Sequence, residues 1–463
     1  MTEGSNLKDL EKRVYEEHIS KRPNSKQLYQ EAQRFMPGGD TRAASFYRPI
    51  PAYMVRGDGC RLYDADGHTY IDFMNNYTSL IHGHAHPETV EAVTKQMKIG
   101  SVYGSPVESQ TELAKEICDR LPSAEKARFC CSGTEATMIA VRLARFHRKK
   151  YKIVKTEGAY HGSQELMEIS VDPDLGKAGP IEKPNSVAED ESIPPNVLKD
   201  CIIAPFNNIP ATEHIIARNH EELAAIIVEP IQGAAGMIPA DPEYLRAVKG
   251  VASNYKIPLI FDEVISLRLA RGGWQEIYDV IPDLTALGKM VGGGLPAGAI
   301  AGREDLMNIS SPLNPNGFYL SGTFHGNPVT TAAGLATLKA LTAQEIDRIN
   351  RLGEKLRIDF EKVFKELGIN AKLTGMGSLN QIHFASHEIK NWRNSTPSER
   401  IDLRKILHLM LLDRGIFVSV RAMFSISTPM SEKEVNQATA ALRGCLLEMK
   451  PYIEKAAPDL IVR

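Results

Sequence analysis

The sequence lacks any apolar run that approaches the ~20 residues of a membrane-spanning helix. Its first twenty residues, MTEGSNLKDLEKRVYEEHIS, mix both charge signs and lack the apolar core of a secretion signal. Cysteine is scarce, with 6 in 463 residues and no C-x-x-C pair, so no disulfide framework is visible. These absences predict a cytoplasmic protein without a membrane partner.

An excess of charge of one sign is also lacking. Lysine and arginine number 55 against 57 acidic residues, which leaves no surplus positive charge to neutralise nucleic-acid phosphates. Three alternating histidines in HGHAHP (82–87) have no cysteine or carboxylate cluster of suitable spacing beside them. We therefore expect neither a nucleic-acid partner nor a metal.

What the sequence contains, from about residue 85 to 325, is an alternation of helix-like stretches with short apolar runs. Near-continuous apolar strands separated by helices indicate a buried, mostly parallel sheet. The expected strands are ARFCCS (127–132), YKIVKT (151–156), AAIIVEP (224–230), PLIFDEV (258–264) and LTALGK (284–289). The pattern predicts a large α/β domain over residues 76–325. The N-terminal segment 1–75 and the C-terminal region 326–463 are expected to form a smaller α+β domain.

Four of these runs finish on a polar group: Ser132, Glu229, Asp262 and Lys289. Ligands bind at the carboxyl ends of the strands in an open α/β sheet, so these side chains are expected to share one site. A single strand that ends in a charge is commonplace, and Glu229 could equally anchor the turn before Pro230.

The run CCSGTEATM passes from a strand through Ser132, Gly133 and Thr134 straight into a helix. Backbone N–H groups at a helix start, together with the two hydroxyls, would bind a phosphate. The run matches neither the Walker pattern nor a dinucleotide fingerprint, and SGTE alone is also typical of ordinary helix capping. The adjacent Cys130 and Cys131 are expected to fill the core rather than to act in redox chemistry.

Lys289 is the one charged residue in LGKMVGGGLPAGA (287–299). A lone lysine often lies along apolar surface with its head in water, whereas a desolvated amine is a nucleophile toward carbonyls. A phosphate cradle, a carboxylate after an apolar strand and a lysine in apolar surroundings are the parts that hold pyridoxal 5′-phosphate. The combination favours a chemical role for Lys289 and predicts this cofactor.

The ordered motifs resemble those of class III aminotransferases, which are fold type I pyridoxal-phosphate enzymes. They are SGTEA (132–136), YHG (160–162), EPIQG (229–233), DEV (262–264), LGKMVGGGLPAGA and SGTFHGNP (321–328). The resemblance covers about residues 30 to 450 and is strongest to the branch that holds glutamate-1-semialdehyde aminomutases and β-phenylalanine aminotransferases. It implies a seven-stranded-type, mostly parallel sheet flanked by helices, and a homodimer with shared active sites.

The resemblance also implies roles for individual residues. Lys289 would form the Schiff base with the cofactor and carry protons, and Asp262 would keep the pyridine nitrogen protonated. Tyr160 would stack on one face of the ring and Val264 would pack against the other. Gln232 would bond the phenolic oxygen.

The phosphate would lie on the residues of the SGT motif, and the partner subunit of the dimer would complete its site. The implied phosphate contacts are Ser132, Gly133 and Thr134, with Thr323 contributed by the second subunit.

Two arginines are implied to bind substrate carboxylates. Arg42 lies in MPGGDTRAASFY (36–47) and would hold the carboxylate of a β-amino acid, whereas Arg421, in SVRAMFSIS (419–427), would help to bind the keto acid acceptor. HGNP after SGTF departs from the β-amino acid pattern.

The leading expectation is an aminotransferase that passes an amino group from a β-amino acid or related amine to a keto acid such as 2-oxoglutarate or pyruvate. The alternative is an isomerase, either a 1,2-aminomutase of the glutamate-1-semialdehyde type or a racemase, because the same lysine and electron sink would serve. A non-catalytic protein on this fold is the third possibility, and the retention of Lys289 and Asp262 disfavours it.

Overall fold

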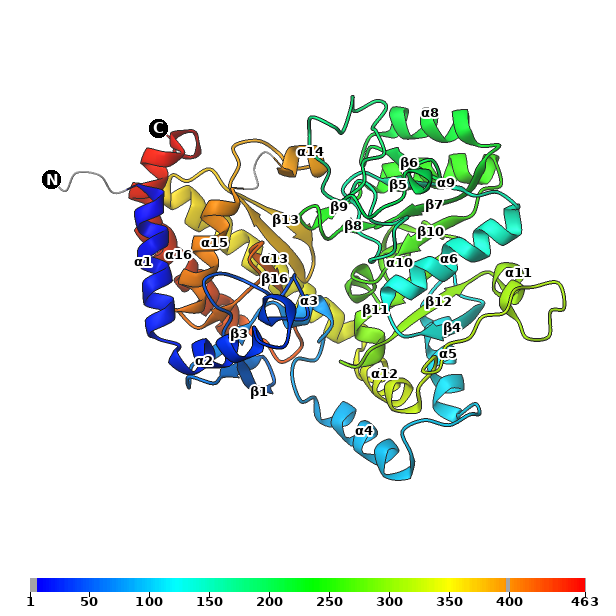
Figure 1. Ribbon diagram of the computed structural model, residues 1–463, viewed down its shortest axis with the longest axis horizontal. Coiled ribbons are helices and arrows are strands. Elements are labelled where there is room, and N and C mark those ends of the chain that lie inside the picture. The colour runs from blue at the N-terminus through cyan, green and yellow to red at the C-terminus, as the bar shows by residue number, and fades with distance from the viewer. Residues whose placement is uncertain (1–5, 397–399, 463) are drawn as a thin grey trace.

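The structure, a computed structural model, describes residues 6–396 and 400–462. The chain forms two halves that lie side by side (Figure 1). One half is built on a seven-stranded sheet and the other combines both ends of the chain.

The helices of the structure fall at these positions: α1 (Leu7–Ser20), α2 (Pro23–Ala32), α3 (Asn75–Thr78), α4 (Pro87–Ile99), α5 (Glu108–Arg120), α6 (Gly133–Arg148), α7 (Pro195–Leu198), α8 (Ile209–Asn219), α9 (Pro242–Asn254), α10 (Trp274–Tyr278), α11 (Glu304–Met307), α12 (Pro328–Ala340), α13 (Ala343–Leu367), α14 (Trp392–Ser395), α15 (Ile401–Leu412) and α16 (Glu432–Ala456).

The large sheet has the strand order β4-β12-β11-β10-β7-β5-β6. Its strands are β4 (Lys126–Cys130), β5 (Lys152–Thr156), β6 (Cys201–Ala204), β7 (Leu223–Val228), β10 (Leu259–Asp262), β11 (Leu284–Gly288) and β12 (Gly298–Gly302). Strand β12 is antiparallel to both of its neighbours, and the other neighbouring pairs are parallel. The predicted α/β class with a mostly parallel seven-stranded sheet is confirmed.

Helices cover both faces of this sheet because its strands are apolar on both faces. In β7, Ala225 and Ile227 pack into the core that contains α6, whereas Ile226 and Val228 pack into the core that contains α8 and α9. Successive side chains of a strand point to opposite faces, so a strand buried on both sides reads as a continuous apolar run. All six residues of β7 are accordingly buried.

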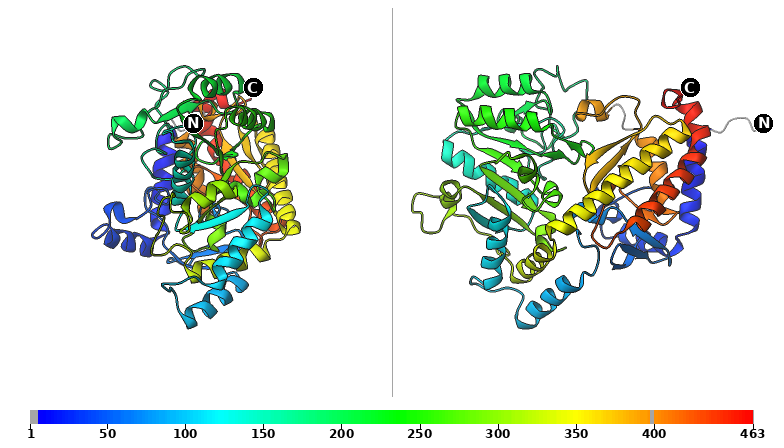
Figure 2. Two further views of the ribbon diagram at one scale, coloured as in Figure 1. Left: turned by 90° about the vertical axis from the view of Figure 1, so that its right-hand side faces the viewer. Right: turned by 180° about the vertical axis from the view of Figure 1, so that it is seen from behind.

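The second half has two smaller sheets, with orders β1-β2-β3-β15 and β13-β14-β16. Their strands are β1 (Met54–Asp58), β2 (Arg61–Asp64), β3 (Thr69–Asp72), β13 (Lys372–Met376), β14 (Leu379–His383), β15 (Ile416–Phe417) and β16 (Met423–Ser425), and a separate pair is β8 (Ile231–Gln232) with β9 (Ile238–Pro239). Strand β15 pairs in parallel with β3, which joins the N- and C-terminal parts of the chain. Helices α13 and α16 lie side by side behind these sheets (Figure 2).

Helix α12 follows residue 325, yet it packs against α4 and α5 rather than against the small sheets. The division of the chain at residues 75 and 325 stays a prediction. In the parts of the chain that the structure describes, no helix combines the length and the apolar character needed to cross a membrane.

Candidate active site

Four segments of the large half converge at the carboxyl ends of its strands. A Cβ built on Gly288, at the end of β11, would lie 3.2 Å from Cα of Gly133 and 3.3 Å from Cγ1 of Val264. A Cβ on Gly162, in the loop after β5, would lie 2.6 Å from Cα of Thr134. Glycine at these positions allows the backbones to approach closely. The structure therefore brings together the segments that the sequence marks as separate motifs.

Asp262 is the last residue of β10, and its side chain is buried. Its Oδ2 lies 2.9 Å from Nδ1 of His161, and its Oδ1 accepts a hydrogen bond of 3.1 Å from the backbone N–H of Val264. Two partners fix the orientation of the carboxylate. Desolvation lowers the pKa of the buried His161, against an opposing effect of Asp262, so the imidazole is neutral at pH 7 and its Nδ1–H donates.

His161 is a site residue that sequence reasoning missed, although it stands in the YHG motif directly after Tyr160. Its Nε2 is buried and has no hydrogen-bond partner in the described part of the chain.

Lys289 follows β11 directly and has a left-handed backbone, with φ of 51°. This conformation is costly for a residue with a side chain, and such strain gathers at functional sites. Desolvation lowers the pKa of the Lys289 amine, while the charges of Asp262 and Glu229 oppose the shift and that of Arg42 adds to it. More of the amine is therefore neutral, and able to accept a proton, than in an exposed lysine.

Glu229 links two loops of the site. Its Oε2 accepts a hydrogen bond of 2.9 Å from the backbone N–H of Tyr160, and its Oε1 accepts one of 3.2 Å from that of Gly233. Desolvation and the charge of Asp262 raise the pKa of this buried carboxyl to about 8, and Lys289 opposes the shift. Glu229 thus anchors the turn, as one sequence interpretation expects, and it is also coupled electrostatically to the reactive groups.

The predicted phosphate cradle, Ser132–Thr134, lies at the start of α6. The hydroxyl of Ser132 caps the helix by accepting a hydrogen bond of 3.1 Å from the N–H of Glu135. The first N–H groups of a helix have no partner within the helix and attract anions. A Cβ on Gly133 would lie 3.0 Å from Val264 Cγ2, so glycine keeps this approach to the helix start open. A lysine, a fixed carboxylate and this helix start fit a phosphate-bearing pyridine aldehyde.

Three other residues, Tyr160, Gln232 and Thr323, are predicted to contact the cofactor, and the structure gives less support for their roles. Tyr160 lies on the loop after β5 with 43% of its surface exposed. Gln232 is buried, but its Nε2 already donates to Thr156 Oγ1 at 3.0 Å and to the Glu157 carbonyl at 2.9 Å. Thr323 is exposed, and within the described residues no hydrogen bond joins it to the cradle. Their assigned roles stay predictions.

The two arginines approach the same tyrosine. Arg42 Nη1 donates a hydrogen bond of 2.6 Å to Asn76 Oδ1, and its guanidinium carbon lies 5.7 Å from the centroid of the Tyr77 ring. Arg421 Nη1 donates to the carbonyl of Ala234 at 2.9 Å. Burial raises the pKa of Tyr77, and the charges of Arg421 and Arg42 oppose that shift, so both cations act on this ring.

The segment that presents Asn76 and Tyr77 is a left-handed turn that the sequence did not reveal. All four residues of α3 have positive φ angles: 48°, 48°, 53° and 72°. Each such residue costs roughly 1–2 kcal/mol, so the surrounding structure must hold the turn. Asp72 Oδ1 accepts from the N–H of Asn75 at 2.8 Å, and Arg268 Nη1 donates to the carbonyl of Thr78 at 3.4 Å.

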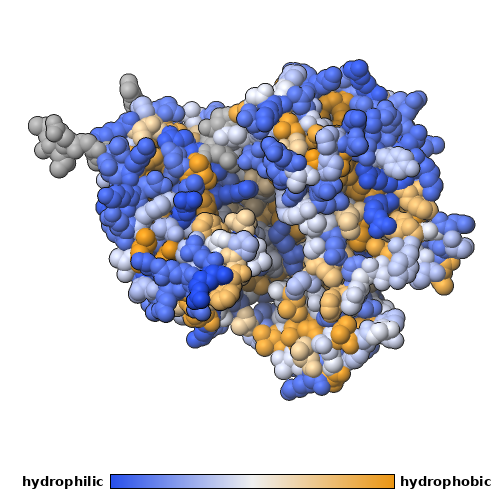
Figure 3. Space-filling model, in the orientation of Figure 1, coloured by the Kyte–Doolittle hydropathy of each residue, from blue (hydrophilic) through white to orange (hydrophobic). Residues whose placement is uncertain are grey.

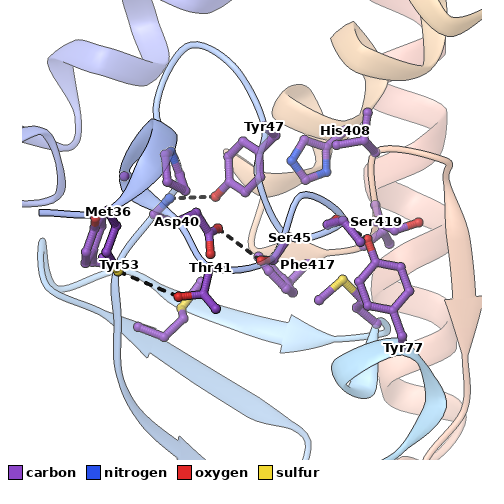
Figure 4. A pocket seen from close by; sticks show the side chains of 18 residues that line it. Met36, Asp40, Thr41, Ser45, Tyr47, Tyr53, Tyr77, His408, Phe417 and Ser419 are labelled. Carbon is purple, nitrogen blue, oxygen red and sulfur yellow. Dashed lines mark hydrogen bonds between the residues drawn. The ribbon is translucent and has the colours of Figure 1, made fainter. Parts of the chain in front are cut away.

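A cavity of about 320 Å³ adjoins this turn (Figure 4). Tyr77 lies in its wall, and the other lining residues come from segments 36–54 and 417–420, with Met74 and His408. Most of the wall is apolar, and Asp40 accepts a hydrogen bond of 3.0 Å from Ser45 Oγ within it. Its lining includes Thr41 and Val420, which directly precede the two arginines in the sequence.

Residues 43–440 match the family model described as Aminotransferase class-III. The chain belongs to this family. A glutamate-1-semialdehyde 2,1-aminomutase of Methanobrevibacter smithii is 39% identical over 91% of this chain and 98% of its own length. An ω-transaminase structure from Sphaerobacter thermophilus has a TM-score of 0.89 and 38% identity, covering 93% of this chain and 99% of that one. A β-phenylalanine aminotransferase from Variovorax paradoxus has a TM-score of 0.88 and 31% identity, covering 96% and 98%.

Family membership and the predicted branch are confirmed, but the leading functional expectation is wrong. Curated relatives with 33% to 40% identity are named glutamate-1-semialdehyde 2,1-aminomutases. They favour the isomerase alternative over transamination of a β-amino acid. The sequence motifs could not separate the two because both reactions need the same lysine, carboxylate and phosphate cradle.

Proposed function

We propose that this protein moves an amino group between adjacent carbons of one small carboxylate substrate, as a 1,2-aminomutase of the glutamate-1-semialdehyde type. Its cofactor is pyridoxal 5′-phosphate. The observation that carries the proposal is the likeness to aminomutases over 91% of the chain, at 39% identity. The site geometry supports it because Asp262 and Lys289, the residues proposed to handle protons, lie at the ends of the neighbouring strands β10 and β11.

When bound, the cofactor supplies a carbonyl carbon for the amine and a ring that withdraws electrons. Lys289 Nζ takes a proton from one substrate carbon and returns one to the neighbouring carbon, and its lowered pKa suits both directions of transfer. Asp262 holds the proton on the ring nitrogen, and His161 and Val264 fix the direction of its carboxylate.

An intramolecular migration needs one substrate molecule to stay bound while its two reacting carbons exchange positions near Lys289. Holding the substrate at its unreactive end allows this movement. Arg42 is the group proposed to do so, because it is exposed to an incoming carboxylate and Asn76 orients its guanidinium. Arg421 is tied to the carbonyl of Ala234, and a second carboxylate site is not needed for one substrate.

The active form is proposed to be a homodimer. Exposed apolar side chains gather over α4 and the segment after it (Figure 3), where Met97 and Ile99 are 55% and 69% exposed. Tyr319 is 87% exposed in the segment just before Thr323. Apolar surface of this kind is typical of an interface, and a second copy that covers it would carry Thr323 to the partner's cradle. A fully active monomer in analytical ultracentrifugation would contradict the dimer.

The reaction is tested by supplying glutamate-1-semialdehyde to the holoenzyme without any keto acid. We expect repeated turnovers to the isomeric 5-aminolevulinate, with no loss of amine nitrogen to an acceptor and no turnover by Lys289→Ala. Chiral analysis of recovered substrate distinguishes racemisation. Amine transfer that depends on 2-oxoglutarate or pyruvate, with no isomerisation in their absence, would overturn the proposal.

A further inference from the structure

Cys131, Glu135 and His325 form a cluster beside the phosphate cradle. The candidate ligand atoms of the three side chains all lie within 4.8 Å of one another, and each residue is partly buried. Cys131 and Glu135 come from the β4–α6 junction, whereas His325 comes from the segment before α12. The sequence did not indicate the cluster because His325 lies 190 residues from Glu135 along the chain.

The positions of these side chains are set by the surrounding chain. Glu135 Oε2 accepts a hydrogen bond of 2.8 Å from the backbone N–H of Cys131 and lies 3.0 Å from His325 Nε2. A Cβ on Gly322 would overlap the imidazole of His325, so the histidine folds back into space that only glycine leaves free. The imidazole is therefore directed toward α6.

We propose that Cys131 Sγ, the Glu135 carboxylate and His325 Nε2 bind one Zn²⁺ ion. Thiolate, imidazole and carboxylate are the ligands that zinc takes, whereas Mg²⁺ and Ca²⁺ prefer oxygen alone. Three protein ligands leave the fourth tetrahedral position open for water. Zinc bond lengths of ~2.0–2.3 Å place tetrahedral ligand atoms roughly 3.3–3.6 Å apart, so the cluster needs shifts of only about 1 Å.

A structural role alone accounts for less of the cluster. The Glu135–His325 hydrogen bond would hold the segment before α12 against α6 without a metal. That hydrogen bond does not explain the position of the Cys131 thiol. The thiol makes no hydrogen bond in the described part of the chain, yet its Sγ lies within 4.8 Å of the candidate ligand atoms of Glu135 and His325. Zinc binding uses all three side chains.

The site would couple metal binding to the cradle. Cys131 and Glu135 flank the residues of the cradle, Ser132–Thr134, and His325 lies two residues after Thr323. A bound ion would tie these segments together and slow the loss of cofactor. The proposal does not depend on which amino-group reaction the enzyme catalyses.

Zinc binding is measured on the reduced, chelator-treated holoenzyme by equilibrium dialysis with Zn²⁺, and with Co²⁺ as a spectroscopic probe. We expect one ion per chain and a thiolate–cobalt absorption band in the wild type. Loss of a residue that hydrogen-bonds to a metal ligand typically weakens metal binding ~10–100-fold. Cys131→Ser and His325→Gln each remove a ligand itself, so they should weaken Zn²⁺ binding by at least as much. Cys118→Ser, which removes a partly buried thiol in α5 outside the cluster, should bind as the wild type does.

Alkylation of individual cysteines gives a second readout that does not require variants to fold. Zn²⁺ should protect Cys131 from iodoacetamide in the wild type and leave the labelling of Cys118 unchanged, as peptide mass spectrometry reports. Failure of the wild type to bind Zn²⁺, equal binding by Cys131→Ser, or unprotected alkylation of Cys131 would each overturn the proposal.

Discussion

His161 Nδ1 lies 2.9 Å from Asp262 Oδ2, and both side chains are buried beneath the carboxyl ends of the strands. The neutral imidazole donates to the carboxylate without bringing a second positive charge to the site. The backbone carbonyl of His161 accepts a hydrogen bond of 2.6 Å from Thr137 Oγ1, and this bond connects the loop after β5 to α6. This geometry makes His161 a positioning residue for Asp262, the carboxylate that is predicted to face the cofactor ring.

Replacing His161 by leucine should remove the donor to Asp262. Hydrogen bonds to charged groups contribute about 1.5–3 kcal/mol, so kcat should fall roughly 10–100-fold, whereas Asp262→Asn should cost more. Thr137→Val is the control, because it removes the hydroxyl that donates to the backbone carbonyls of His161 and Thr134 and leaves the bond between His161 and Asp262 in place. Steady-state kinetics and the absorbance of bound cofactor measure the effect. A kcat within twofold of the wild type would show that His161 does not position Asp262.

The five strands predicted from apolar runs all exist in the large sheet, because strands buried on both faces need apolar side chains throughout. Two of its strands escaped prediction. Strand β6 has only four residues, Cys201–Ala204, and β12 is the sequence GAIAG, which has little β propensity. Close backbone contact explains this composition, since a Cβ on Gly302 would lie 2.5 Å from the carbonyl oxygen of Asp283.

Lys289→Ala should retain cofactor noncovalently and lose turnover. Asp262 and the start of α6 are proposed to hold the cofactor independently of the lysine, whereas positioned proton transfer contributes ~10²–10⁴-fold to the rate. Borohydride reduction followed by peptide mapping should place the cofactor on Lys289 in the wild type and on no residue in the variant. A cofactor label on another lysine of the wild type would contradict this assignment.

Glu229 should make the stability of the cofactor-free protein depend on pH. Its pKa rises from 4.5 to about 8 on folding, so between these values the folded state binds more protons than the unfolded chain. The contribution of Glu229 to the free energy of unfolding should therefore decrease as pH rises from 4.5 to about 8, and it should stay constant at higher pH. Glu229→Gln lacks this titration, and its stability relative to the wild type should improve from pH 5 to pH 9 in urea unfolding. A constant difference would show that Glu229 is not desolvated as the structure indicates.

As with the strands of the large sheet, sequence patterns predict some parts of the candidate site and not others. Lys289 and Asp262 follow apolar strands, and this placement predicts that they meet at one edge of the sheet. The left-handed turn of Asn75–Thr78 carries no such signal, because only Asn76 and its neighbour Asn75 tolerate that conformation readily. Its position depends on contacts from Asp72 and Arg268 that are set by tertiary structure.

The two arginines should differ in importance if the enzyme acts on one substrate. Arg42→Ala should raise KM for glutamate-1-semialdehyde about tenfold, since the lost charged hydrogen bonds are worth ~1.5–3 kcal/mol before the exposure of Arg42 reduces their effect. Asn76→Ala should give a smaller increase, because it leaves the guanidinium present but no longer held at 2.6 Å. Arg421→Ala should change KM little, because its bond to the Ala234 carbonyl serves the loop after β8 rather than a second acid. Initial-rate kinetics measure KM for glutamate-1-semialdehyde in the three variants and in the wild type. Equal KM increases for Arg42→Ala and Arg421→Ala would show that both guanidinium groups bind the substrate, and no increase for Arg42→Ala would remove it from the substrate site.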